Sequence, residues 1–82
     1  MLTTQPGRSR NLLTLLSKRE QEVLQLVALD KTDREVAHHL GIGERTVRAH
    51  VSRIILKLGV ASRVGASVAF VEWTMRGHAQ SL

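Results

Sequence analysis

Residues 43–59 read GERTVRAHVSRIILKLG, and their spacing predicts an α-helix with two different sides. One side is a continuous apolar stripe at positions i, i+4, i+7, i+8 and i+11, formed by Val47, Val51, Ile54, Ile55 and Leu58. The other side is basic, small or hydroxylic, with no carboxylate after the helix start: Arg45, Arg48, Ala49, Ser52, Arg53 and Lys57. The apolar stripe suits burial in a core, which leaves the second side for solvent or for a partner.

Two interpretations of this second side are open from the stretch alone. A helix that is apolar behind and cationic in front suits a DNA major groove, where Arg pairs with guanine and Ala contacts a thymine methyl. An ordinary surface helix with a solvated basic face has the same pattern. The residues that precede the stretch favour the first interpretation.

Two capping boxes and a glycine turn precede this helix. Residues 17–20 (SKRE) form the first box and predict a helix over about 18–29. Residues 32–35 (TDRE) form the second box and open a short helix that Gly41 ends in a left-handed conformation. A short helix, a tight turn and a longer amphipathic helix starting near Glu44 together predict a helix-turn-helix.

A fourth helix is predicted over about 63–75, after Gly59 ends the third helix, and Gly77 is expected to close it. This helix has more apolar surface than one side can bury. One side, with Ala66, Phe70 and Trp73, can cover the first helix, while the surplus residues face away from it: Val64, Val68 and Val71. The surplus predicts a homodimer. The alternative is that both sides are buried in a compact four-helix core.

Length and composition predict one small all-α domain. The chain has 82 residues, of which 43% are hydrophobic but only 2% aromatic, so the core must be aliphatic. We expect a flexible tail or linker remnant over residues 1–11, a four-helix helix-turn-helix domain over residues 12–77, and a frayed C-terminus over residues 78–82.

Charge and cysteine content narrow the class of partner. The formal net charge is +5 with a pI near 11.2, which suits an anionic partner, with nucleic acid ahead of a membrane. The chain has no cysteine, which excludes disulfides and thiolate metal sites. It has no apolar run long enough for a signal peptide or a membrane span, so a cytoplasmic protein that does not bind membranes is expected.

Neither catalysis nor metal binding is predicted. The four histidines, at 38, 39, 50 and 78, have no cysteine or carboxylate cluster beside them to complete a zinc site. Ser52, His50 and Asp33 do not form a catalytic set, because two residues two apart on a helix point about 200° apart. Without a Gly-rich phosphate loop either, we expect no cofactor and no enzymatic activity.

The residues from Leu16 to about Trp73 resemble the LuxR-type helix-turn-helix DNA-binding domain, also called the FixJ or GerE type. The matching runs are LSKREQEVLQLVA, TDREVAHHL, GERTVRAHVSRIILKLGV and SRVGA. The resemblance implies a bacterial transcription regulator domain that binds duplex DNA as a dimer. Each third helix would enter the major groove, and the fourth helix would mediate dimerisation.

The resemblance also implies a role for individual residues. The base-contacting places of the family fall on Arg45, Arg48, Ala49 and Ser52. Its phosphate-contacting places fall on Thr32, Thr46, Arg53, Lys57 and Arg63. In this division the phosphate contacts position the protein and the groove-facing side chains specify the sequence.

Four residues depart from the family pattern. Asp30 stands where glycine usually ends the first helix, so a left-handed residue there would be strained. Gly43 replaces the usual Ser or Thr cap of the third helix. Leu56 replaces a usual Arg or Lys on the polar face, and Ala49 is shorter than most residues at its position.

Two further functions are weighed against DNA binding. One is a sigma-factor-like adaptor that acts mainly through protein contacts. The other is an RNA-binding helical module, which is disfavoured because the two aromatic residues, Phe70 and Trp73, both lie on the predicted dimer helix. Further partners expected from the resemblance are RNA polymerase and an upstream sensory domain or separate partner.

Overall fold

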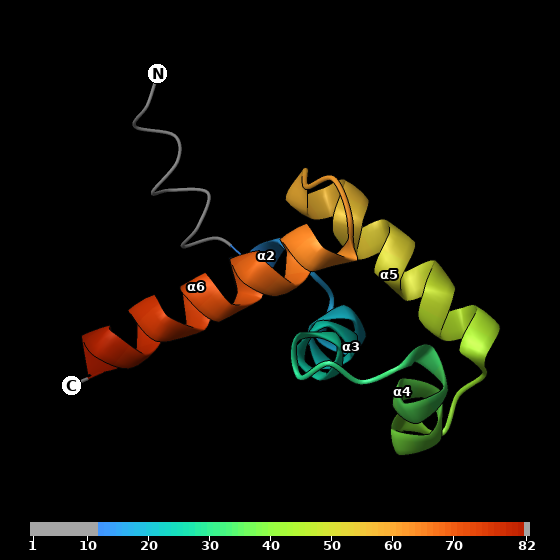
Figure 1. The fold of residues 1–82 in the computed structure, drawn as a ribbon. Helices are drawn as coiled ribbons and strands as arrows, with labels where there is room; N and C mark the ends of the chain where they lie inside the picture. The colour runs from blue at the N-terminus through green and yellow to red at the C-terminus, as the bar shows by residue number, and fades with distance from the viewer. Residues whose placement is uncertain (1–11, 82) are drawn as a thin grey trace.

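The structure, a computed structural model, describes the backbone of residues 12–81 and the side chains of residues 14–76. Over residues 12–81 it is helical and contains no strand (Figure 1). The helices are α2 (Leu12–Leu15), α3 (Lys18–Ala28), α4 (Asp33–Leu40), α5 (Glu44–Leu58) and α6 (Arg63–Ser81). The all-α fold and its four main helices are as predicted, and α2 adds one turn before them. The predicted tail, residues 1–11, lies outside the described residues.

Both predicted capping boxes are present. At the start of α3, Ser17 Oγ accepts from the Glu20 amide at 3.1 Å, and Glu20 Oε1 accepts from the Ser17 amide at 2.9 Å. At the start of α4, Thr32 Oγ1 and Glu35 Oε1 make the same reciprocal pair at 3.1 and 2.8 Å. Each box satisfies two amides that have no partner within their own helix.

Three residues with positive φ produce the turns between the helices. Gly41 ends α4 at φ 69° and Gly59 ends α5 at φ 68°, both in the left-handed conformation that glycine adopts without a Cβ penalty. Asp30, between α3 and α4, has φ 66°. Asp30 therefore adopts the left-handed conformation although it has a Cβ, which is the source of the backbone strain expected at this position.

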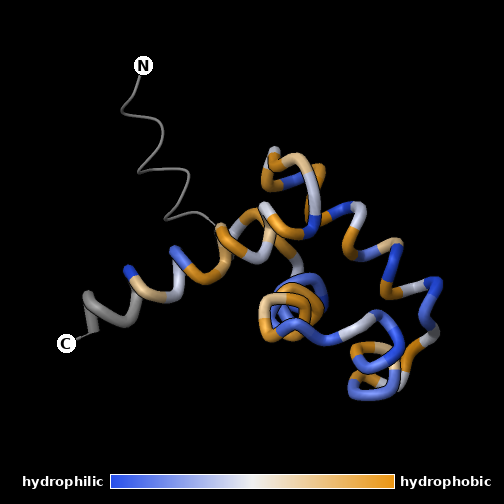
Figure 2. Tube along the Cα trace, viewed as in Figure 1, coloured by the Kyte–Doolittle hydropathy of each residue, from blue (hydrophilic) through white to orange (hydrophobic). Residues whose placement is uncertain are grey.

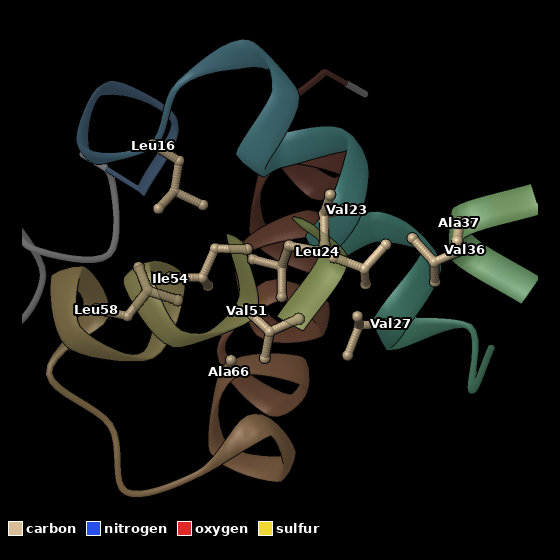
Figure 3. Close-up of a cluster of buried hydrophobic side chains, with 11 residues drawn as sticks. Leu16, Val23, Leu24, Val27, Val36, Ala37, Val51, Ile54, Leu58 and Ala66 are labelled. Carbon is tan, nitrogen blue, oxygen red and sulfur yellow. The ribbon is translucent and has the colours of Figure 1, made fainter. Parts of the chain in front are cut away.

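The core lies where α3, α4, α5 and α6 meet, and it is aliphatic as predicted. Figure 3 shows labelled side chains from these helices gathered in the space between them. Among the described residues, the buried hydrophobic ones are Leu16, Val23, Leu24, Val27, Val36, Ala37, Val47, Val51, Ile54, Leu58 and Ala66. The apolar stripe of α5 thus anchors that helix and fixes which of its sides faces outward.

The two sides of α6 differ as the sequence predicts. Ala66 is buried, and Phe70 and Trp73 pack against the core with ring centroids 6.0 Å apart. The helix crosses α3 and continues beyond the bundle (Figure 1). The predicted end near 75, closed by Gly77, is wrong because α6 runs to Ser81. A glycine within a helix costs only about 1 kcal/mol relative to alanine, so it need not stop one.

Hydrophobic and hydrophilic residues alternate along α5, whereas α4 and the connection before it are mostly hydrophilic (Figure 2).

In the part of the chain that the structure describes, no single helix has the length and apolar character needed to cross a membrane. By length and composition alone, α5 and α6 meet that criterion together, as a pair bent by 66°.

Candidate nucleic-acid interface

The outward side of α5 is free of the rest of the described chain. The four predicted base-contacting residues, Arg45, Arg48, Ala49 and Ser52, are all exposed. At 100° per residue, Arg45, Ala49 and Ser52 fall within a sector of about 60°, and Arg48 lies about 40° outside it, on one flank. This sector is opposite the buried stripe, so burying one side in the core presents the other as a continuous ridge.

The turn between α4 and α5 holds α5 in position. The Ile42 amide donates to the Ala37 carbonyl at 3.0 Å, and the Ile42 side chain packs against the core. Gly43 then begins α5 as its N-cap and makes no side-chain capping bond, as its lack of a side chain requires. With Val36 and Val47 both fully buried, α4 supports the N-terminal half of α5 from behind.

Arg48 lies close to a carboxylate on its own helix. Its Nη1 is 3.8 Å from Oε1 of Glu44, one turn earlier, and both side chains are about half exposed. An exposed pair at this distance contributes little free energy. The Arg48 guanidinium can therefore leave Glu44 for a base edge at small cost.

Three of the five predicted phosphate-contacting residues are exposed polar side chains without an ion-pair partner among the described contacts. Thr46 and Arg53 lie on one flank of the α5 ridge, and the Arg53 Nη1 is 3.4 Å from Nδ1 of His50. Thr32 is also exposed. Its hydroxyl oxygen accepts from Glu35, which leaves the hydroxyl hydrogen to be donated to a phosphate.

Lys57 is in a different situation, because its ammonium is paired inside the protein. The Nζ atom donates to Oε1 of Glu20 at 2.8 Å. Glu20 is only 3% exposed, whereas the Lys57 side chain is 40% exposed. The pair joins the start of α3 to the end of α5. If Lys57 contacts a phosphate, its ammonium must either be shared between the phosphate and Glu20 or leave Glu20.

The charge of Glu20 is favoured despite its burial. Burial of the carboxyl raises the pKa of Glu20, but hydrogen bonds from Lys57 and from the Ser17 amide outweigh this effect, so the pKa lies below its ordinary value. The pKa of Glu35 is also lowered, first by its hydrogen bond with the Thr32 backbone. Both capping carboxylates are therefore ionised near neutral pH.

Arg63, the fifth predicted phosphate contact, is half-buried and also paired. Its Nη1 donates to Oδ1 of Asp33 at 2.8 Å, which joins the start of α6 to the start of α4. Sequence reasoning missed both Glu20 and Asp33 as partners of these cations. The partners are 37 and 30 residues apart, so no local spacing signals them.

The predicted dimer residues lie together on the outer side of α6. Val64, Val68 and Val71 are 68%, 50% and 44% exposed. An apolar groove continues from them between α6 and the end of α3, and its lining includes Leu29 and Met75. The alternative, in which both sides of α6 are buried within one chain, is not what the structure shows.

The histidines of the described part are dispersed. His38 and His39 are exposed and line a shallow groove together with Lys31 and Arg34, whereas His50 is half-buried on α5. Over the described residues, no three His, Asp or Glu side chains are grouped so that they could hold a metal ion. His78 lies among the residues whose side chains are not described.

Comparison with known proteins identifies the family and supports the fold. The family described as bacterial regulatory proteins, luxR family, has a model that matches residues 14–70, from before the first capping box into α6. The chain belongs to the luxR family. The match includes α3, α4, α5 and the first part of α6, which are the elements that build and present the α5 ridge.

Individual relatives agree with this assignment. This luxR-family chain is 52% identical over 54 residues to the spore germination protein GerE of Bacillus subtilis, covering 66% of the chain and 73% of GerE. It is 46% identical over 67 residues to the transcriptional regulatory protein TdiR of Thauera aromatica, covering 82% of the chain and 28% of TdiR. It is 33% identical over 66 residues to the nitrate/nitrite response regulator protein NarP of Escherichia coli, covering 80% of the chain and 31% of NarP.

A solved structure of the transcription factor GerE has the same fold. It superposes with a TM-score of 0.66 at 40% identity, covering 71% of this luxR-family chain and 87% of that chain. The chain is therefore a DNA-binding helix-turn-helix domain of a transcription regulator, and not an enzyme. It spans most of the length of GerE but less than a third of TdiR and NarP.

Proposed function

We propose that this luxR-family domain binds specific double-stranded DNA by placing α5 in the major groove, and that it regulates transcription in this way. The observation that carries the proposal is the two-sided burial of α5. Val47, Val51 and Ile54 are buried in the core, whereas Arg45 and Ser52 are exposed on the opposite side. Arg48 is exposed on the flank beside them. A major groove about 12 Å wide admits a helix presented in this way.

The exposed residues divide between reading and positioning. Arg45 and Arg48 have the guanidinium fork that pairs with guanine, Ser52 can donate or accept, and Ala49 can contact a thymine methyl. Thr32, Thr46 and Arg53 are the phosphate contacts that the structure favours most, because Lys57 and Arg63 are already held by carboxylates. Lys57 and Arg63 stay in the proposal with a smaller expected contribution.

We propose that the domain binds DNA as a homodimer through Val64, Val68 and Val71 of α6. Their exposure and the adjoining apolar groove support a self-complementary interface. Each protomer would then read one half-site, with the two half-sites about one helical turn, roughly 34 Å, apart. The operator would accordingly be a palindrome.

Further partners follow from the relatives. NarP is named a response regulator, so we propose that an input reaches this domain from a sensory domain or a separate partner. We also propose, from the family resemblance alone, that RNA polymerase receives the output. Because the family is one of bacterial regulatory proteins and the proposed ligand is DNA, we propose that the domain acts in the cytoplasm.

The alternative function is an adaptor that works mainly through protein contacts. Selection of bound fragments from a random pool of duplex DNA, with the whole 82-residue chain as bait, separates the two functions. The DNA-binding proposal requires enrichment of a palindrome with half-sites one helical turn apart. Enrichment of a single half-site without a palindromic partner would contradict the dimer but not DNA binding. No enrichment would favour the adaptor. An RNA pool run in parallel tests the RNA-binding alternative.

A further inference from the structure

Leu56 has the highest exposure of the large hydrophobic side chains that the structure describes, at 82%. The other strongly exposed ones, Leu29, Val64, Val68 and Met75, belong to α6 or to the end of α3 beside it. Leu56 is the exposed large hydrophobic residue of α5, where the other large apolar side chains are buried or half-buried. Its solvent exposure is therefore not explained by the proposed dimer surface.

The position of Leu56 connects it with the ridge that faces DNA. Arg45, Ala49, Ser52 and Leu56 are spaced i, i+4, i+7 and i+11, so they form one line along α5 within a sector of about 60°. Leu56 lies about 6 Å along the helix axis beyond Ser52 and about 16 Å beyond Arg45. A helix that lies along the groove with Arg45 and Ser52 on the base edges directs Leu56 toward the same edges, one or two base pairs further on.

We propose that Leu56 is a specificity-determining residue that packs against the 5-methyl group of a thymine at the end of each half-site. This inference rests on the proposed function. A leucine side chain has no hydrogen-bond donor or acceptor, and the thymine methyl is the apolar group that base edges present in the major groove. The contact would select thymine at one position without reading any hydrogen-bonding pattern.

A protein partner is a weaker explanation of the same side chain. Surfaces that bind proteins through apolar contact are contiguous patches, usually of several hundred square ångströms. The helical neighbours of Leu56 on the exposed side are Ser52, Arg53 and Lys57, which are polar or charged. An isolated apolar side chain among basic ones fits a nucleic acid, where the cations contact phosphates and the leucine contacts the base between them.

The test removes the methyl group from the DNA and the leucine from the protein separately. Binding is measured on the site obtained by selection, with each thymine of one half-site replaced in turn by deoxyuridine, which lacks only the 5-methyl. For the wild-type protein, one such replacement should weaken binding about fourfold, which corresponds to the roughly 0.8 kcal/mol of one buried methyl group. For Leu56→Ala, the same replacement should change nothing. A thymine whose methyl matters to both proteins is assigned to Ala49.

Two further variants control the interpretation. Leu15→Ala removes another exposed leucine, 38% exposed in α2 and outside both the α5 ridge and the proposed dimer surface, and should keep the full dependence on the methyl group. Leu56→Lys should lose that dependence and steepen the salt dependence by about one in the log–log slope, because a cation replaces an apolar contact. Circular dichroism of each variant checks that the helices are intact.

The outcomes separate this inference from the proposed function. If selection enriches no site for the wild-type protein, the proposed function fails and the inference fails with it. If a site is enriched but every deoxyuridine replacement affects wild type and Leu56→Ala equally, the inference alone is overturned. The same holds if Leu56→Ala weakens all sites uniformly, because that result indicates contact with sugar or phosphate and not with a base.

Discussion

The ammonium of Lys57 lies 2.8 Å from Oε1 of Glu20, the same oxygen that accepts the Ser17 amide in the first capping box. One buried carboxylate therefore both starts α3 and holds the end of α5 against it. This arrangement gives Lys57 a structural role that the family resemblance does not imply. It also predicts that substitution of Lys57 affects folding at least as much as DNA binding.

Lys57→Met should lower the free energy of unfolding by about 1–3 kcal/mol, because it leaves the Glu20 carboxylate buried without its cation. We do not expect a loss of stability as large as that from breaking a fully buried ion pair, since the Lys57 side chain is 40% exposed. Urea denaturation measures the change. Arg53→Met is the matched control on the same helix and should stay within about 0.5 kcal/mol of wild type. Equal losses in both variants would contradict the structural role of Lys57.

The same pair predicts a pH dependence of stability. The pKa of Glu20 is lower in the folded protein than the ordinary glutamate value of 4.5, so its stabilisation is complete above that value and is lost as the pH falls through the lower, folded pKa. Glu20→Gln should therefore lose less stability than wild type between pH 5 and pH 3, since glutamine can still complete the capping box. Urea denaturation at a series of pH values measures this.

Glu35 is the control for this experiment, because the pKa of Glu35 is lowered too. Glu35→Gln should remove a separate part of the acid sensitivity and leave that of Glu20 in place. If Glu20→Gln loses as much stability on acidification as wild type, the ion pair with Lys57 does not stabilise the folded state.

Asp30 offers a test of backbone strain. It has φ 66° between α3 and α4, a conformation in which a Cβ is unfavourable. Asp30→Gly should raise the free energy of unfolding by about 0.5–1 kcal/mol, and Asp30→Ala should lower it. Thermal and urea unfolding of the two variants give the comparison. A glycine variant no more stable than the alanine variant would show that this residue is not strained.

The proposed dimer surface is tested by Val71→Glu. Val71 is 44% exposed, so the charge can be solvated in the monomer but would be buried in a dimer. Sedimentation velocity should show loss of self-association, and circular dichroism should show intact helices. Ala66→Glu, at a residue 1% exposed on the opposite side of the same helix, should instead unfold the domain. If Val71→Glu sediments as the wild type does, the proposed dimer surface is wrong.

Features that depend on local sequence were predictable, and those that depend on packing were not. The capping boxes at Ser17 and Thr32 and the left-handed glycines at 41 and 59 depend on neighbours within four residues, and all are present. The outward side of α5 was predictable for the same reason, since helical periodicity separates the two sides.

Contacts between helices could not be predicted from the sequence pattern. Whether Lys57 faces a phosphate or Glu20 depends on how the end of α5 packs on the start of α3, 37 residues earlier. Arg63 and Asp33 are a similar case, 30 residues apart. The end of α6 was misplaced because Gly77 only weakens a helix, and no proline follows it to stop the chain from continuing.

We expect the exposed side of α5 to read DNA sequence while its flank contacts phosphate. The most direct measurement is a set of binding titrations across salt concentration, for Arg48→Ala and Arg53→Ala, on the selected site and on single-base variants of it. Arg48→Ala should weaken binding to the selected site by about 1–3 kcal/mol and abolish discrimination at one base pair. Arg53→Ala should weaken all sequences alike and lower the salt slope by about one. Identical behaviour of the two variants on every site and at every salt concentration would contradict this division of α5 into base-reading and phosphate-contacting residues.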